Sequence, residues 1–129
     1  MREILFRGKR IDKNNPANNG KWFEGVYFPE DDITPAIIYG GTRHNHGVFV
    51  DSETVGQYTG LTDKNGKRIF EGDIVRAKRI NTDKSYLGDV IWWIGCFAIQ
   101  EAETRNVPAI DLFYEYEVIG NIHDNPELL

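Results

Sequence analysis

The chain has 129 residues, of which 40% are hydrophobic and 27% charged, as in one soluble globular domain rather than a disordered chain. The formal net charge of −5 disfavours general binding to a phosphate backbone. Cys96 is the single cysteine, which excludes an intrachain disulfide. The first apolar run is too short for a signal peptide, and no run reaches the roughly 20 residues that span a bilayer. We expect a cytoplasmic protein of one domain, residues 1–129, without a membrane segment.

Four short apolar runs predict strands in the first half of the chain: residues 4–11, 22–28, 36–39 and 48–50. Residues 12–20 are rich in Asn, Asp, Pro and Gly, which favour turns, so the first two runs form a hairpin. Residues 29–34 interrupt the pattern and are the best internal boundary. The sequence therefore predicts a small N-terminal hairpin unit over residues 1–30.

The second half predicts strands at residues 54–59, 69–70, 74–75, 86–94, 96–100 and 114–119. Asn65-Gly66 favours a type I′ hairpin turn, which needs positive φ at both central residues. A second turn is expected at residues 71–73. Residues 90–94 are apolar on both faces, which indicates a central, doubly buried strand or one face against a partner. Pro108 forbids a long helix nearby.

These patterns together predict an all-β protein with little helix. The turn at residues 71–73 is followed directly by an apolar strand, an arrangement typical of the entry of a small SH3-like barrel. Such a barrel would extend from about residue 55 to residue 122, after the N-terminal hairpin. This expectation concerns the fold alone, because a fold does not determine a function.

Three blocks of sequence are distinctive. The central one is TGLTDKNGKRIFEGDIV at residues 59–75, the first combines FRGKR at residues 6–10 with WFEG at residues 22–25, and the last is VIGNIHDNP at residues 118–126. Together these blocks resemble the YopX family of phage and prophage proteins over nearly the whole chain. The resemblance implies a phage or prophage gene in a bacterium. It brings with it no catalytic residue.

A polar cluster in the central block consists of Asp63, Arg68, Glu71 and Asp73. Its carboxylates could bind a divalent cation, as a metal-dependent hydrolase requires. Turn chemistry explains the same residues: Asp63 accepts backbone N–H groups, and Glu71 or Asp73 pairs with Arg68. We favour this structural interpretation and predict no metal and no cofactor.

The remaining reactive side chains give no stronger signal. His44 and His46, with the distant His123, could be zinc ligands, because a His-x-His pattern on a strand puts both rings on one face. No third ligand is evident, so a solvated loop is favoured. Cys96 would need a base and an electropositive setting to be a nucleophile. It lies in an apolar run without a neighbouring His, so we predict a buried structural thiol and no catalytic residue.

Charge is distributed unevenly along the chain. Residues 64–84 carry seven bases and three acids, a net +4, whereas the remainder carries −9. The bases, with Tyr86, Trp92 and Trp93, could form a groove for single-stranded nucleic acid. Strand aromatics usually lie in a core, and scattered bases are usually solvated. Nucleic-acid binding is therefore the alternative rather than the leading hypothesis.

The leading hypothesis is a binding module rather than an enzyme, acting on a host or phage protein. Its candidate interaction residues are Arg68, Glu71, Asp73, Arg76, Lys78, Arg79, Trp92 and Trp93. Aromatic residues occupy both faces of the first hairpin (Trp22, Phe23, Tyr27 and Phe28), and one face should contact something apolar. We therefore expect a homo-oligomer, with a dimer as the simplest closed form.

Overall fold

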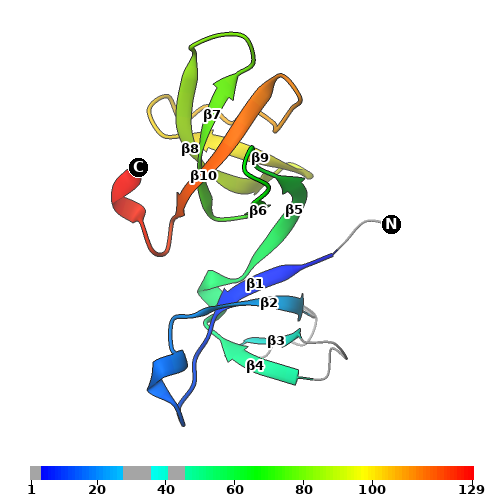
Figure 1. The fold of residues 1–129 in the computed structure, drawn as a ribbon, viewed down its shortest axis with the longest axis vertical. Helices are drawn as coiled ribbons and strands as arrows, with labels where there is room; N and C mark the ends of the chain where they lie inside the picture. The colour runs from blue at the N-terminus through cyan, green and yellow to red at the C-terminus, as the bar shows by residue number, and fades with distance from the viewer. Residues whose placement is uncertain (1–3, 28–35, 41–45) are drawn as a thin grey trace. The chain divides into compact units, whose positions relative to one another are not determined.

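The computed structural model describes residues 4–27, 36–40 and 46–129, and its regular structure is almost entirely β (Figure 1). The chain divides into two compact units, Met1–Tyr58 and Thr59–Leu129. Within the described residues, three short 3-10 helices occur, at Pro16–Asn18, Ser52–Thr54 and Pro126–Leu128. The all-β prediction is confirmed. Among the described residues, no helix is long and apolar enough to cross a membrane.

The N-terminal unit is an antiparallel sheet in the order β4-β3-β2-β1-β5. Its strands are β1 (Phe6–Lys9), β2 (Trp22–Tyr27), β3 (Ala36–Gly40), β4 (His46–Val50) and the first residues of β5 (Gly56–Thr62). β1 pairs with β2 from Phe6 opposite Gly25 to Lys9 opposite Trp22. The predicted pairing of the first two strands is therefore confirmed, and the unit that contains them extends to Tyr58. The boundary predicted at residues 29–34 lies outside the described residues.

Three aromatic side chains of the hairpin, Trp22, Phe23 and Tyr27, contact other residues of the chain. Phe23 and Tyr27 pack against a core of Ala36, Ile38 and Val50. The Arg7 guanidinium lies 4.5 Å from the centre of the Trp22 ring on the other face, a favourable cation–π arrangement. Trp22, Phe23 and Tyr27 are half-buried, and the homo-oligomer expected from them stays a prediction. Phe28 lies outside the described residues.

The chain just beyond β1 pairs with the end of β4, the outer strand of this sheet. Arg10 forms an isolated antiparallel bridge with Val50 of β4. The Ile11 N–H donates to the Phe49 carbonyl at 2.9 Å, and the Asp51 N–H donates to the Lys9 carbonyl at 2.9 Å. The end of β4 is thus paired on both sides.

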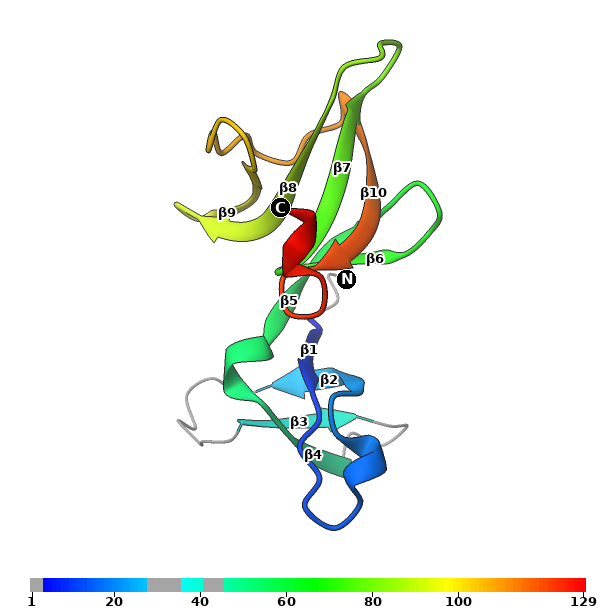
Figure 2. The same cartoon turned by 90° about the vertical axis from the view of Figure 1, so that its left-hand side faces the viewer.

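The C-terminal unit contains the last residues of β5, which pair with β6, and a four-stranded antiparallel sheet in the order β10-β7-β8-β9 (Figure 2). Its strands are β6 (Arg68–Phe70), β7 (Asp73–Arg79), β8 (Ser85–Trp93), β9 (Cys96–Glu101) and β10 (Tyr114–Asn121). The expected SH3-like barrel is not confirmed, because the sheets are not closed.

One face of this sheet carries the core of the unit. Its buried residues are Ile69, Val75, Ala77, Val90, Ile99 and Tyr116. Tyr114 and Val118 pack against them, as the alternation along residues 114–119 predicts. Removing these apolar side chains from water is the main favourable contribution to folding here.

The loop at residues 63–67 differs from the predicted type I′ turn. Gly66 has a φ of +81°, but Asn65 is not at positive φ. The Asp63 carboxylate accepts the N–H groups of Asn65 and Lys67, both at 2.9 Å, and the Asp63 N–H donates to the Lys67 carbonyl at 2.7 Å. The Asp63 side chain therefore holds a three-residue loop with glycine at its left-handed position.

We expect Gly66→Val to lower the free energy of unfolding by about 1–3 kcal/mol, because a β-branched residue resists positive φ. A Cβ atom at this position meets no atom within 4 Å, so the loss reports mainly backbone strain. Thermal denaturation measures it. Gly66→Asn is the control and should lose less, since Asn tolerates the left-handed region. Equal melting of the valine variant and the wild type would contradict the loop assignment.

Candidate interaction site

Two buried carboxylates in the central block accept backbone hydrogen bonds. Asp63 receives a third N–H, from Val118, at 3.0 Å through Oδ2. Burial alone would raise the pKa of Asp63, but the N–H groups of Val118, Lys67 and Asn65 outweigh it and lower that pKa. Asp73 accepts the Phe70 N–H at 2.8 Å. The predicted role of Asp63 as a backbone acceptor is confirmed, and Asp73 has the same role.

No group of three or more His, Cys, Asp or Glu side chains suited to a metal ion occurs in the described part of the chain. His44 and the side chain of His46 lie outside that part. Burial raises the pKa of both Tyr86 and Asp89, yet the alternation along β8 places them on opposite faces. Nothing here points to a hydrolase.

Acidic side chains of β10 accompany the bases of β7. Arg76 is paired with Glu117 in the sheet, and its guanidinium lies 3.3 Å from that carboxylate. The Lys64 ammonium contacts the same carboxylate at 3.0 Å. Lys78 is opposite Glu115 in the register. This neighbourhood offsets much of the positive charge that a phosphate backbone would need.

Lys78, one of the bases of β7, is separated from the two tryptophans by the length of β8. Lys78 of β7 pairs with Ser85, the first residue of β8, whereas Trp93 is its last residue. A nine-residue strand spans roughly 30 Å. Lys78 and the two tryptophans therefore lie toward opposite ends of β8, and nothing in the described residues points to nucleic-acid binding.

The tryptophans lie instead at the tip of the β8–β9 hairpin. Trp93 pairs with Cys96, and the two loop residues between them, Ile94 and Gly95, have φ values of +45° and +83°. Ile94 is 85% exposed, Trp92 52% and Trp93 49%. The prediction of a doubly buried strand at residues 90–94 is wrong at this end, because the strand extends past the side chains that cover it.

Cys96 is exposed at the same tip. The prediction of a buried structural thiol is wrong for the same reason, since the apolar run containing Cys96 begins beyond the core. Its Sγ lies 3.4 Å from the Trp93 carbonyl oxygen. This contact gives Cys96 no general base. The thiol is a small polar group at the same tip as the large apolar side chains of Trp92, Trp93 and Ile94.

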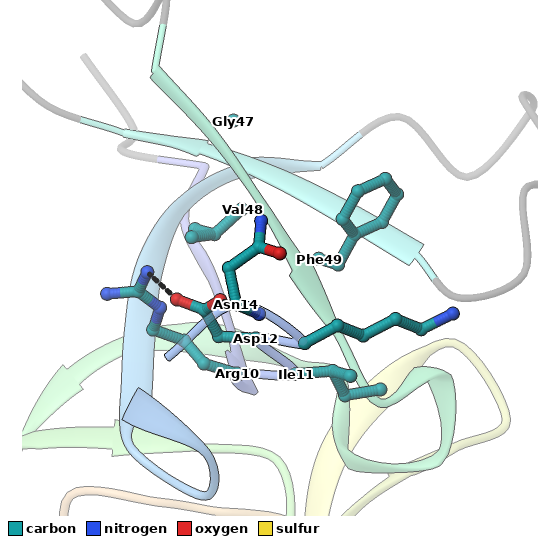
Figure 3. A pocket seen from close by; sticks show the side chains of 8 residues that line it. Arg10, Ile11, Asp12, Asn14, Gly47, Val48 and Phe49 are labelled. Carbon is teal, nitrogen blue, oxygen red and sulfur yellow. Dashed lines mark hydrogen bonds and ion pairs between the residues drawn. The ribbon is translucent and has the colours of Figure 1, made fainter. Parts of the chain in front are cut away.

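A second surface feature lies in the N-terminal unit (Figure 3). A hollow of about 450 Å³ lies between the segment Arg10–Asn14 and the segment Gly47–Phe49 of β4. The Arg10 guanidinium and the Asp12 carboxylate approach to 3.7 Å at its wall. The Asn18 amide, then the Asn15 N–H, lower the pKa of Asp12. None of these residues was a candidate in the sequence.

Comparison with known proteins identifies the family of the chain. A family model described as "YopX protein" matches residues 6–129. The chain belongs to the YopX family. The crystal structure of protein EF1440 from Enterococcus faecalis is similar over 98% of both chains, with 24% sequence identity and a TM-score of 0.51. At this identity the likeness concerns the fold alone. No curated protein matches the chain.

In this YopX chain the distinctive block at residues 59–75 is built into the fold. Ile69, Phe70, Ile74 and Val75 are buried, and Asp63 and Asp73 accept the backbone hydrogen bonds of its turns. The exposed candidate interaction residues are Arg68, Arg76, Lys78, Arg79, Trp92 and Trp93. Whether any of them contacts a partner stays a prediction.

Proposed function

We propose that this YopX chain is a non-enzymatic interaction module of phage or prophage origin, which binds a host or phage protein in the bacterial cytoplasm. The tip of the β8–β9 hairpin, Trp92 to Ile94, is the contact surface. The observation that carries the proposal is Ile94, a β-branched residue that combines a φ of +45° with 85% exposure.

Ile94 costs stability without contributing to the core of its own unit. A β-branched residue in the left-handed region is strained by about 1–3 kcal/mol, and an exposed isoleucine recovers little of that by burial. Glycine or asparagine would satisfy the turn without this strain. Strain of this kind persists where a residue serves a purpose other than folding, and a partner that buries Ile94 supplies one.

The neighbouring side chains suit a protein partner. Trp92 is held in a T-shaped contact with Phe97, with ring centres 4.8 Å apart, so it is ordered before binding. Trp93 points to the opposite face of the strand. Tryptophan is enriched among the residues that dominate protein interfaces, and an ordered ring loses little entropy on association.

We expect Ile94→Gly to raise the free energy of unfolding by about 1 kcal/mol, because it relieves the strain at positive φ. The same variant should weaken binding to a partner captured from phage-infected cells by about tenfold or more. Chemical denaturation and calorimetric titration measure the two effects. Higher stability combined with weaker binding shows that Ile94 has a role in contacting a partner rather than in the fold.

Phe113→Ser is the matched control, because Phe113 is 70% exposed and lies in the loop before β10. It should leave binding unchanged. If Ile94→Gly binds as tightly as the wild type, the tip is not the contact surface. If light scattering shows a dimer that Ile94→Gly abolishes, the partner is a second copy of the chain, which would account for the expected homo-oligomer.

A further inference from the structure

The outer edge of β4 presents unpaired backbone groups. The Ile11 N–H donates to the Phe49 carbonyl, so the backbone of Phe49 faces away from β3. Alternation along a strand directs the N–H and C=O of Gly47 the same way. No partner for these two groups, or for the Phe49 N–H, is found among the residues the structure describes. Three unpaired groups in a row form a template for another strand.

The hollow described above lies along this edge. Gly47, Val48 and Phe49 form one wall, and the segment Arg10–Asn14 forms the other (Figure 3). The Phe49 ring is 51% exposed and offers an apolar surface beside the backbone. An added strand would thus find main-chain partners on one side and room for its side chains on the other.

The charge at the hollow favours an acidic occupant. The Asp12 carboxylate is occupied by the Arg10 guanidinium, the N–H groups of Asn14 and Asn15, and the Asn18 amide. Lys13 also lines the hollow and has no ion pair with any residue in the described ranges. Its ammonium is therefore available to a carboxylate entering the hollow.

We propose that an extended peptide segment of a partner protein, carrying an acidic side chain, adds as a strand to the outer edge of β4. The Gly47 and Phe49 backbone groups bind its main chain, and Lys13 binds its carboxylate. The inference deepens the proposed interaction function, and it uses a surface in the N-terminal unit that shares no residue with the hairpin tip.

The test is a selection of random short peptides, displayed and captured on the full-length protein. Selected peptides should carry Asp or Glu at a fixed position and should bind Phe49→Pro about tenfold more weakly, because proline removes the N–H from an edge strand that loses no internal hydrogen bond. Phe49→Ala is the control: it loses the ring but keeps the N–H, and should bind more tightly than Phe49→Pro. Lys13→Glu should shift the preference from acidic to basic peptides.

Hydrogen exchange gives a readout that does not depend on variants. Peptide binding should protect the Gly47 and Phe49 amides, because both gain an acceptor. Equal binding to Phe49→Pro and Phe49→Ala, or protection confined to other amides, overturns the inference. Ile94→Gly should bind the selected peptides like the wild type, so failure at this edge and failure at the hairpin tip are distinguishable.

Discussion

Asp63→Ala should lower the free energy of unfolding of the C-terminal unit by about 3–5 kcal/mol, because it leaves three backbone N–H groups without their acceptor. Asp63 is a residue only 7% exposed, and its carboxylate accepts from the N–H groups of Asn65, Lys67 and Val118. The side chain thereby ties the β5–β6 loop to β10. Urea denaturation measures the loss, and Asp83→Ala, at an exposed position in the β7–β8 turn, should change stability by less than about 0.5 kcal/mol. An Asp63→Ala variant as stable as the wild type would contradict the hydrogen-bond assignment.

The same residue makes stability depend on acid. The folded pKa of Asp63 lies below its ordinary value, so the folded state favours the charged form. Its contribution is fully present above the unfolded pKa of about 4 and is lost as the pH falls through the folded pKa. Between about pH 5 and pH 2, the free energy of unfolding should therefore fall more steeply with decreasing pH for the wild type than for Asp63→Asn, which has no such proton to bind. Equal slopes would show that Asp63 is not the group responsible.

The loop around Asp63 shows what local sequence signals can and cannot predict about a turn. Asparagine and glycine predict a hairpin loop, and a hairpin loop forms. Their local preference does not choose between a two-residue and a three-residue loop, because the choice depends on where the Asp63 carboxylate finds donors. One of those donors, Val118, lies 55 residues away in the chain. The loop's existence could be predicted, whereas its geometry depends on the sheet around it.

The candidate surfaces were harder to predict for a related reason. Trp92, Trp93 and Cys96 belong to an apolar run, and such a run indicates burial unless the strand extends beyond its neighbours. That depends on the relative lengths of β8 and the elements covering it, which sequence patterns do not give. The pairing of Arg10 with Val50, which bounds the hollow, joins residues far apart in sequence, with no periodic signal at Arg10.

Gly25→Ala should destabilise the N-terminal unit by about 3 kcal/mol or more, because β2 and β3 meet there without room for a side chain. A Cβ atom at residue 25 would overlap the Tyr39 carbonyl oxygen and lie 2.7 Å from its carbon. The backbone cannot yield without breaking the pairing of Val26 with Tyr39, which positions the fully buried Ile38. Lys21→Ala, at an exposed residue just before β2, is the control and should remain within about 0.5 kcal/mol of the wild type.

Hydrogen exchange on Gly25→Ala also tests whether the two units unfold separately. Each unit has its own buried cluster, so local opening of one need not expose the core of the other. We expect amides of β2 and β3 to lose protection while those of β7 and β8 keep theirs. Simultaneous loss in all four strands would mean that the chain unfolds as one cooperative domain, as its length alone predicts. Wild-type protection of β2 and β3 would contradict the close approach of these strands at Gly25.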